Sequence, residues 1–194
     1  MSDTIEETQT VVRPKSMTEL EACLPDILAA PKDNGTVDMI VVRPAHGERL
    51  TPASHSLSLA KGVEGDHWAK GCHVTLPDGS PSPEVQICLM PSRVIRAIAG
   101  DRENWAPAGD NLFIDMDLTP DNTPPGTRLG LGTVEMVITE EPHKGCKHFI
   151  ARYGRDACLF VNVGQGGDLK MRGIYARVTR DGTVSVGDKV RKLT

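Results

Sequence analysis

The stretch GIYARVTRDGTVSVGDKVRKL, residues 173–193, decides the fold class. Apolar and polar residues alternate along it, and the pairs Asp181-Gly182 and Gly187-Asp188 interrupt it. Alternation with a period of two is typical of a half-buried strand, and Asp-Gly between two such runs is a hairpin signal. The stretch therefore predicts a hairpin at Asp181-Gly182 and three short strands, at 173–179, 183–186 and 189–193.

The same pattern recurs in short segments towards the N-terminus. The 194 residues include 19 glycines and 14 prolines, a share above the roughly 12 % of an average protein, and these residues lie between the apolar runs. A regular alternation of strands and long helices is absent. We therefore predict a mainly β protein, a β-barrel or strongly curved sheet with a few short peripheral helices. Further strands are expected at 36–42, 84–90, 111–115, 127–131, 133–139 and 157–163.

Three segments show the spacing of a helix rather than of a strand. Residues 17–30 carry apolar side chains at helical intervals and end before Pro31, with Pro25 as a point at which this helix could kink or split. Residues 92–99 and 145–153 are two shorter candidates. The length favours one principal domain. We expect an N-terminal tail and short helix over 1–35, followed by the β-barrel domain over 36–194.

The composition disfavours several classes of partner. With 39 % hydrophobic and 25 % charged residues the chain is of ordinary globular type, and its net charge of −4 provides no basic field for nucleic acid. Its apolar runs are far shorter than the ~20 residues that span a bilayer, and the first residues, MSDTIEET, lack the pattern of a signal peptide. We therefore expect a cytoplasmic protein with neither a nucleic-acid nor a membrane partner.

The cysteines are expected to be free thiols, because their number is odd and no C-x-x-C pair occurs. Cys23, Cys88 and Cys158 lie in apolar segments and are predicted to be in the core. The sequence also lacks a Walker loop, a serine nucleophile elbow, a lysine motif for pyridoxal phosphate and a cysteine cluster for an iron–sulfur centre.

Cys146 is the strongest candidate for a functional residue. It lies in TEEPHKGCKHF, residues 139–149, where a strand is expected to end and a helix to begin. The N–H groups of a helix start, with His143, Lys144 and the neighbouring basic residues, favour negative charge and lower a thiol pKa from its usual ~8.5. A thiolate is the form that attacks, carries sulfur or binds metal. The alternative is a buried structural cysteine.

Three weaker patterns have competing interpretations. His143, Cys146 and His148 are of the ligand types that bind zinc, although their spacing is not a standard one. The loop GVEGDHW, residues 62–68, is either a site in which Asp66 orients His67 or simply a turn. The glycines of GQGG, residues 164–167, are able to cradle an anion, but a mobile turn is the favoured interpretation.

Taken in order, the motifs resemble those of the MOSC domain family over about residues 36–193. The resemblance implies a β-barrel fold and a link to molybdenum-cofactor chemistry, in which a single cysteine binds the metal or carries sulfur. By position that cysteine is Cys146. The motifs that carry the resemblance are Gly65-Asp66-His67, EVQICLM at 84–90, GDNL at 109–112, GTRLG at 126–130, Pro142 before Cys146, GIYARV at 173–178 and GDKV at 187–190.

The resemblance also implies a cofactor, partners and pocket residues. The cofactor would be the molybdenum cofactor, with Cys146 as its metal ligand, and the partner a cysteine desulfurase as sulfur donor or an electron-transfer protein. The residues expected to contact the cofactor are Asp66, His67, Gly109, Asn111, His143 and Lys144.

Three functions remain open on the sequence. The first is a small stand-alone MOSC domain protein whose Cys146 thiolate either ligates molybdenum or holds a persulfide. If it is an enzyme, it is a molybdenum-dependent oxidoreductase or a sulfur transferase. The second is a non-enzymatic barrel that binds a small anion or a partner protein, and the third is a structural zinc protein.

Overall fold

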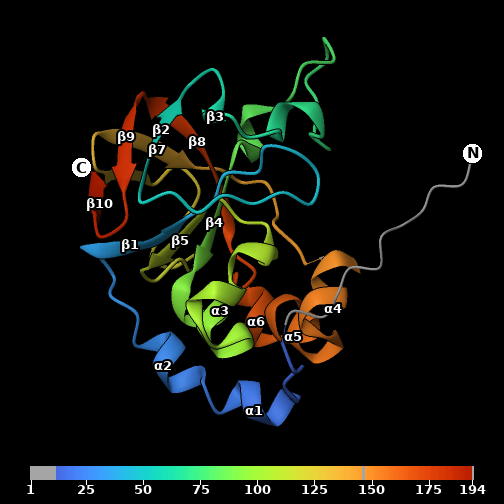
Figure 1. Ribbon diagram of the computed structural model, residues 1–194. Coiled ribbons are helices and arrows are strands. Elements are labelled where there is room, and N and C mark those ends of the chain that lie inside the picture. The colour runs from blue at the N-terminus through green and yellow to red at the C-terminus, as the bar shows by residue number, and fades with distance from the viewer. Residues whose placement is uncertain (1–11, 146, 194) are drawn as a thin grey trace, which may run out of the picture.

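Two β-sheets form the frame of the molecule. The computed structural model describes residues 12–145 and 147–193. Seven strands close into a barrel: β1 (Gly35–Ile40), β4 (Ile87–Pro91), β5 (Leu112–Asp115), β6 (Arg128–Leu131), β7 (Val134–Ile138), β8 (Ile174–Arg180) and β10 (Lys189–Leu193). Their order around the barrel is β1-β10-β6-β7-β8-β4-β5. A second sheet has the order β3-β2-β9 and consists of β2 (Ser54–Ser58), β3 (Gly62–Val63) and β9 (Gly182–Ser185) (Figure 1). The predicted β-barrel is confirmed.

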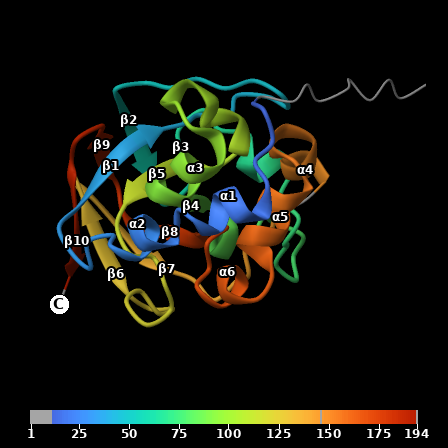
Figure 2. The same ribbon diagram turned by 90° about the horizontal axis from the view of Figure 1, so that it is seen from below.

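The helices gather at one end of the barrel (Figures 1 and 2). They are α1 (Met17–Glu21), α2 (Leu24–Leu28), α3 (Ser92–Ala99), α4 (Lys147–Tyr153), α5 (Arg155–Asn162) and α6 (Gln165–Asp168). Short 3₁₀ turns occur at Trp68–Lys70, Pro83–Val85, Arg102–Asn104 and Ala106–Ala108. None of the helices in the described part of the chain is long and apolar enough to cross a membrane.

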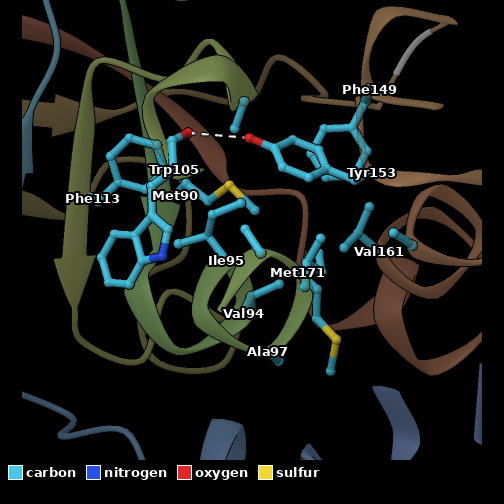
Figure 3. Close-up of a cluster of buried hydrophobic side chains, with 14 of the residues drawn as sticks. Met90, Val94, Ile95, Ala97, Trp105, Phe113, Phe149, Tyr153, Val161 and Met171 are labelled. Carbon is cyan, nitrogen blue, oxygen red and sulfur yellow. Dashed lines mark hydrogen bonds between the residues drawn. The ribbon is translucent and has the colours of Figure 1, made fainter. Parts of the chain in front are cut away.

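Strands β4 and β5 are buried on both faces and separate two hydrophobic cores. Leu89 and Ile114 belong to a core that packs the barrel strands together, whereas their neighbours Met90 and Phe113 point into a core beneath the helices. Successive side chains of a strand point to opposite faces, so both cores are built from the same two strands. Figure 3 shows the helical core, in which the Tyr153 hydroxyl donates hydrogen bonds to backbone carbonyls, including that of Trp105 at 3.4 Å.

The predicted helix over 17–30 is two helices. Ser16 and Glu19 form a capping box at the start of α1, which ends at Glu21, and α2 begins at Leu24 with Pro25 in its first turn. Proline is tolerated there because the first N–H groups of a helix have no partner within it. The two helices lie under α3 and α5 as separate short segments (Figure 2).

The prediction of a strand over 157–163 is wrong, because this segment belongs to α5. Ala157, Cys158, Phe160 and Val161 are buried and lie on one helical face against the second core. A short apolar run satisfies the pattern of a buried strand and of a buried helix equally well. The GQGG segment that follows forms the short helix α6 rather than a mobile turn, and Gly166 packs directly on the backbone of Phe160.

The predicted hairpin at Asp181-Gly182 is also wrong. β8 pairs with β4 and β7, whereas β9 pairs with β2, so the two strands on either side of the turn belong to different sheets. The Asp181 carboxylate accepts the backbone N–H of Leu59 at 2.7 Å, and Gly182 lies against the backbone of Thr133. The turn therefore carries the chain from the barrel to the second sheet. The strand β2 is largely polar and β3 has only two residues, so neither carries a clear sequence signal.

We expect Gly173→Ala to destabilise the barrel by at least about 3 kcal/mol. Gly173 precedes β8 with a φ of 102°, and a Cβ atom there would overlap the Leu89 carbonyl of β4. Gly187 has a similar φ of 94° and open space around it, so Gly187→Ala measures the backbone strain alone, about 1 kcal/mol. Urea unfolding of both variants tests this; equal losses would contradict the close approach.

Candidate functional site

A cavity of about 110 Å³ lies beside the neighbouring strands β4 and β8. Cys88 of β4 pairs with Tyr175 of β8, and both side chains line the cavity. The segment 67–73 supplies much of the remaining wall, including His67, Trp68 and Cys72. Burial raises the pKa of the Cys88 thiol to about 11, although nearby Arg43 opposes the shift. Cys88 is therefore a neutral thiol near pH 7.

A buried ion pair forms the wall behind this cavity. Arg43 follows β1, and its Nε and Nη2 atoms donate to the two carboxylate oxygens of Asp66 at 2.8 and 2.9 Å. The Asp66 side chain is only 1 % exposed. Burial raises the pKa of this carboxyl, but the hydrogen bonds and charge of Arg43 outweigh burial and hold the pKa below its usual value. Asp66 is therefore ionised, and both of its carboxylate oxygens accept hydrogen bonds from Arg43.

Asn111 joins this ion pair to the barrel. Its Oδ1 atom accepts from Arg43 Nη2 at 3.2 Å and from the backbone N–H of Cys88 at 3.1 Å, and its Nδ2 atom donates to Asp66 at 3.1 Å. The carbonyl of Gly109 accepts from Arg43 Nη1 at 2.9 Å. The structure thus brings together Asp66, Gly109 and Asn111, three of the residues predicted from the sequence.

His67 is oriented by the same segment. Its Nδ1 atom lies 2.6 Å from the carbonyl oxygen of Arg43, and because a carbonyl only accepts, Nδ1 carries the proton. This tautomer leaves Nε2 as an acceptor for a ligand. The neighbouring Trp68 places its indole N–H in a buried position with no hydrogen-bond acceptor among the described residues.

A second buried group lies beneath the segment that precedes Cys146. Arg172 Nη1 contacts both carboxylate oxygens of Asp110, at 2.8 and 2.9 Å, and the guanidinium stacks over the ring of Phe149 at 4.9 Å. The ring of His143 packs against Tyr175 at 4.4 Å, which places it next to the cavity. Its Nδ1 atom is 3.7 Å from Asp110, too far for a hydrogen bond.

His143 is a neutral imidazole. Its side chain is 7 % exposed. Burial, followed by the charges of Arg172 and Arg43, lowers its pKa well below the usual value. His143 Nδ1 and Arg172 Nε are both buried, and neither has a hydrogen-bond partner among residues 12–145 and 147–193.

Cys146 itself lies outside the described residues, but its neighbours are fixed. The N–H of Gly145 donates to Asn162 Oδ1 at 2.9 Å, and Asn162 Nδ2 donates to the Cys158 carbonyl at 2.8 Å. A Cβ atom at Gly145 would approach the Asn162 amide to 2.7 Å, so a larger residue there would displace the Asn162 side chain. Lys144 and Lys147 on either side are exposed.

His148, the other histidine of this segment, has different surroundings from His143. Its ring meets that of His46 edge to face at 6.2 Å. Within the described part of the chain no three His, Cys, Asp or Glu side chains are arranged to hold a metal ion. The zinc alternative includes Cys146 and so stays a prediction that the described residues do not test.

Sequence reasoning missed the residues that hold the site together. Arg43, Asp110, Asn162 and Arg172 form its buried polar contacts, and none was predicted as a site residue. The available signal was an arginine directly after an apolar strand, at Arg43. Asp110 lies in the quoted motif GDNL, but its partner Arg172 is remote in the sequence, as is Gly145, the partner of Asn162.

The MOSC domain model matches residues 78–191, more than half of the chain. The chain belongs to the MOSC domain family. The matched part of the MOSC domain contains Cys88, Gly109, Asn111, His143 and the position of Cys146, whereas Arg43 and Asp66 precede it.

Solved structures share the fold of this MOSC domain. A structure described as a hypothetical protein has a TM-score of 0.55 and 19 % identity, and the match covers 84 % of this chain and 69 % of that one. YuaD from Bacillus subtilis has a TM-score of 0.52 and 14 % identity, covering 82 % and 97 %. YiiM from Escherichia coli has a TM-score of 0.52 and 18 % identity, covering 82 % and 70 %. No curated protein sequence matches significantly. At these identities the likeness concerns the fold alone.

We expect Asp66→Asn to destabilise the MOSC domain by about 3 to 5 kcal/mol, because the substitution leaves the Arg43 charge buried without its counter-ion. Glu64, two residues away, pairs with Lys61 at the surface. Glu64→Gln therefore serves as the matched control and should change stability little. Chemical denaturation of both variants provides the measurement. A small loss in Asp66→Asn would show that the ion pair is dispensable.

His143 should weaken the fold as the pH falls. Its pKa is lowered in the folded state, so the unfolded chain binds the proton more readily. The resulting loss of stability begins near the unfolded pKa of about 6.5 and reaches about 1.4 kcal/mol by pH 5.5. His143→Phe keeps a ring against Tyr175 and should remove this part of the dependence. Unfolding free energies at pH 7.5 and 5.5 test the difference; parallel profiles would argue against a buried neutral imidazole.

Proposed function

We propose that this MOSC domain protein binds the molybdenum cofactor and that Cys146 supplies a thiolate ligand to its metal. One observation carries the proposal. Among the described residues, five buried side-chain nitrogen or oxygen atoms lack a hydrogen-bond partner, and three belong to the candidate site: Trp68 Nε1, His143 Nδ1 and Arg172 Nε. Each such atom costs about 1–3 kcal/mol in the absence of a partner. Their concentration in one region favours a polar ligand.

The chemistry of these atoms fits the cofactor. The arginine and indole nitrogens are obligate donors, and they suit oxygen atoms and anionic groups. A soft thiolate suits a metal that is also bound by sulfur. The cavity of about 110 Å³ is smaller than the roughly 300 Å³ or more of sites that enclose a drug-sized ligand. It therefore suits one polar end of the cofactor rather than the whole pterin.

The protein residues divide into those that organise the wall and those that would meet the ligand. Every N–H of Arg43 already has an acceptor: Asp66, Asn111, the Gly109 carbonyl and, at 3.9 Å, the Cys88 sulfur. Arg43, with Asp66 and Asn111, therefore holds the wall in shape without binding ligand directly.

Arg172, His143 and Trp68 retain unused polar atoms and would hold the cofactor's oxygen atoms. The exposed Lys144 and Lys147 beside Cys146 favour its thiolate form. His143 stays neutral because burial and nearby arginines oppose its protonation. When bound, the cofactor would supply redox or sulfur-transfer chemistry at its metal, while these residues fix its position and protonation.

The test is anaerobic purification from a host that makes the cofactor, followed by elemental analysis and intact mass. We expect near-stoichiometric molybdenum in the wild type and at least about a tenfold loss in Cys146→Ser, as for the removal of a metal-site group. Cys72→Ser is the matched control, since Cys72 also lines the cavity, and should retain the metal.

The other outcomes distinguish the alternatives. One additional reducible sulfur on Cys146 without molybdenum would replace the proposal by a persulfide carrier supplied by a cysteine desulfurase. Zinc that is lost in His143→Ala would favour the structural metal site. A metal-free protein with an unmodified Cys146, from a host with ample cofactor, would favour the non-enzymatic binding module.

A further inference from the structure

A group of basic side chains lies at the turn that contains Gly109. Arg152 Nη1 donates to the Pro107 carbonyl at 2.7 Å, and Arg49 Nη2 would lie 3.8 Å from a Cβ atom at Gly109. The rings of His46 and His148 meet edge to face at 6.2 Å. Arg49 and His46 come from the loop after β1, and Arg152 and His148 come from α4. Two remote segments thus bring four basic side chains together, which we call the basic cluster.

The arginines of the basic cluster have no ion-pair partner among the described residues. The ion pairs in this part of the structure engage Arg43 and Arg172, but none within 4.0 Å involves Arg49 or Arg152. Burial lowers the pKa of Arg49, and the charges of Arg152 and Arg43 lower it further. The Asp66 carboxylate opposes this shift in Arg49, but Arg43 already pairs with it through both carboxylate oxygens. Arg49 and Arg152 therefore repel each other without a carboxylate partner of their own in the described part of the chain.

The guanidinium groups of Arg49 and Arg152 are each fixed by a hydrogen bond, but several of their N–H groups have no described acceptor. Arg49 Nη1 donates to the Glu48 carbonyl at 2.6 Å, and its Nε atom is buried without an acceptor. Arg152 makes its described hydrogen bond to the Pro107 carbonyl alone. A guanidinium has five N–H groups, so most of those on the two side chains remain available. Anchored guanidinium groups with unused donors are preorganised for an anion.

We propose that the basic cluster of Arg49, Arg152, His46 and His148 binds a dianionic oxyanion of the phosphate class. A phosphate group accepts several hydrogen bonds at once and matches the fork of a guanidinium. Its two negative charges would offset the repulsion between Arg49 and Arg152. The imidazoles of His46 and His148 provide further donors at the rim. The proposal does not depend on Cys146 or on a metal.

The charge and the partial burial of the cluster favour a small oxyanion over an acidic protein surface. Arg49 and Arg152 are both half-buried, and each has its position fixed by a backbone carbonyl. An extended acidic peptide would need cations spread along a surface, whereas these donors converge on one point. The phosphate could be inorganic or part of an ester, and the two sources share the same recognition chemistry.

The experiment is an NMR titration of the full chain at constant ionic strength, with inorganic phosphate in one arm and a simple phosphate monoester, glycerol 3-phosphate, in the other. We expect saturable shifts of the His46 and His148 ring signals on binding. Arg152→Gln should weaken phosphate binding by about tenfold or more, as for a hydrogen bond to a charged group. Tighter binding in the second arm would identify an ester as the source.

Matched variants exclude indirect effects. Arg96 is an exposed arginine on α3 that pairs with Asp26, so Arg96→Gln removes the same charge far from the cluster and should leave binding unchanged. Arg49→Lys keeps the charge without the fork and should bind more weakly, which gives a second test if Arg152→Gln fails to fold.

Three results would overturn the proposal. They are shifts that do not saturate or that chloride reproduces at the same ionic strength, equal affinity in the wild type and both arginine variants, or binding of an oligoglutamate peptide without binding of phosphate. The last result would assign the cluster to an acidic protein partner.

Discussion

The buried ion pair between Arg43 and Asp66 is the interaction on which the cavity depends. It links the loop after β1 to the segment that covers the cavity, and through Asn111 and Gly109 it links both to β4 and β5. Removing two charges from water costs several kcal/mol, and only complete hydrogen bonding compensates this cost. Here each oxygen of Asp66 and each N–H of Arg43 has a partner. A partial rearrangement of these loops would expose an uncompensated charge, so the wall is rigid.

The two-sided burial of β4 and β5 explains why the site lies where it does. Because both faces of these strands are covered, the helical core must lie directly beside the barrel, and the ring of His143, which precedes α4, packs against β8. Tyr175 packs on the ring of His143 and also lines the cavity. The same strand carries Arg172 just before its start, beneath Gly145. The packing of the cores thus brings residues that are remote in the sequence into one site.

The parts of the fold that depend on local pattern were predictable, and those that depend on remote pairing were not. Alternation located β1, β8 and β10 because one face of each strand is polar. It could not show that β9 leaves β8 to pair with β2, since a turn dipeptide specifies a bend and not the partner of the next strand. At the site, the order of the motifs indicated Asp66 and Asn111, but not Arg43, whose side chain donates to both. A charged residue is expected at the surface until its buried counter-ion is known.

The arginines of this region show how structural and ligand-binding roles separate in one small volume. Arg43 and Arg172 are both buried and both paired with an aspartate, yet Arg43 has exhausted its donors whereas Arg172 has kept Nε free of any described acceptor. Arg49 is less buried, has no described carboxylate partner and also retains Nε. Folding alone favours the arrangement of Arg43, because each unpaired buried donor subtracts from a small net stability. The two proposed ligands, the cofactor at Arg172 and a phosphate group at Arg49, would each present oxygen atoms to these donors and so offset the cost of their incomplete pairing.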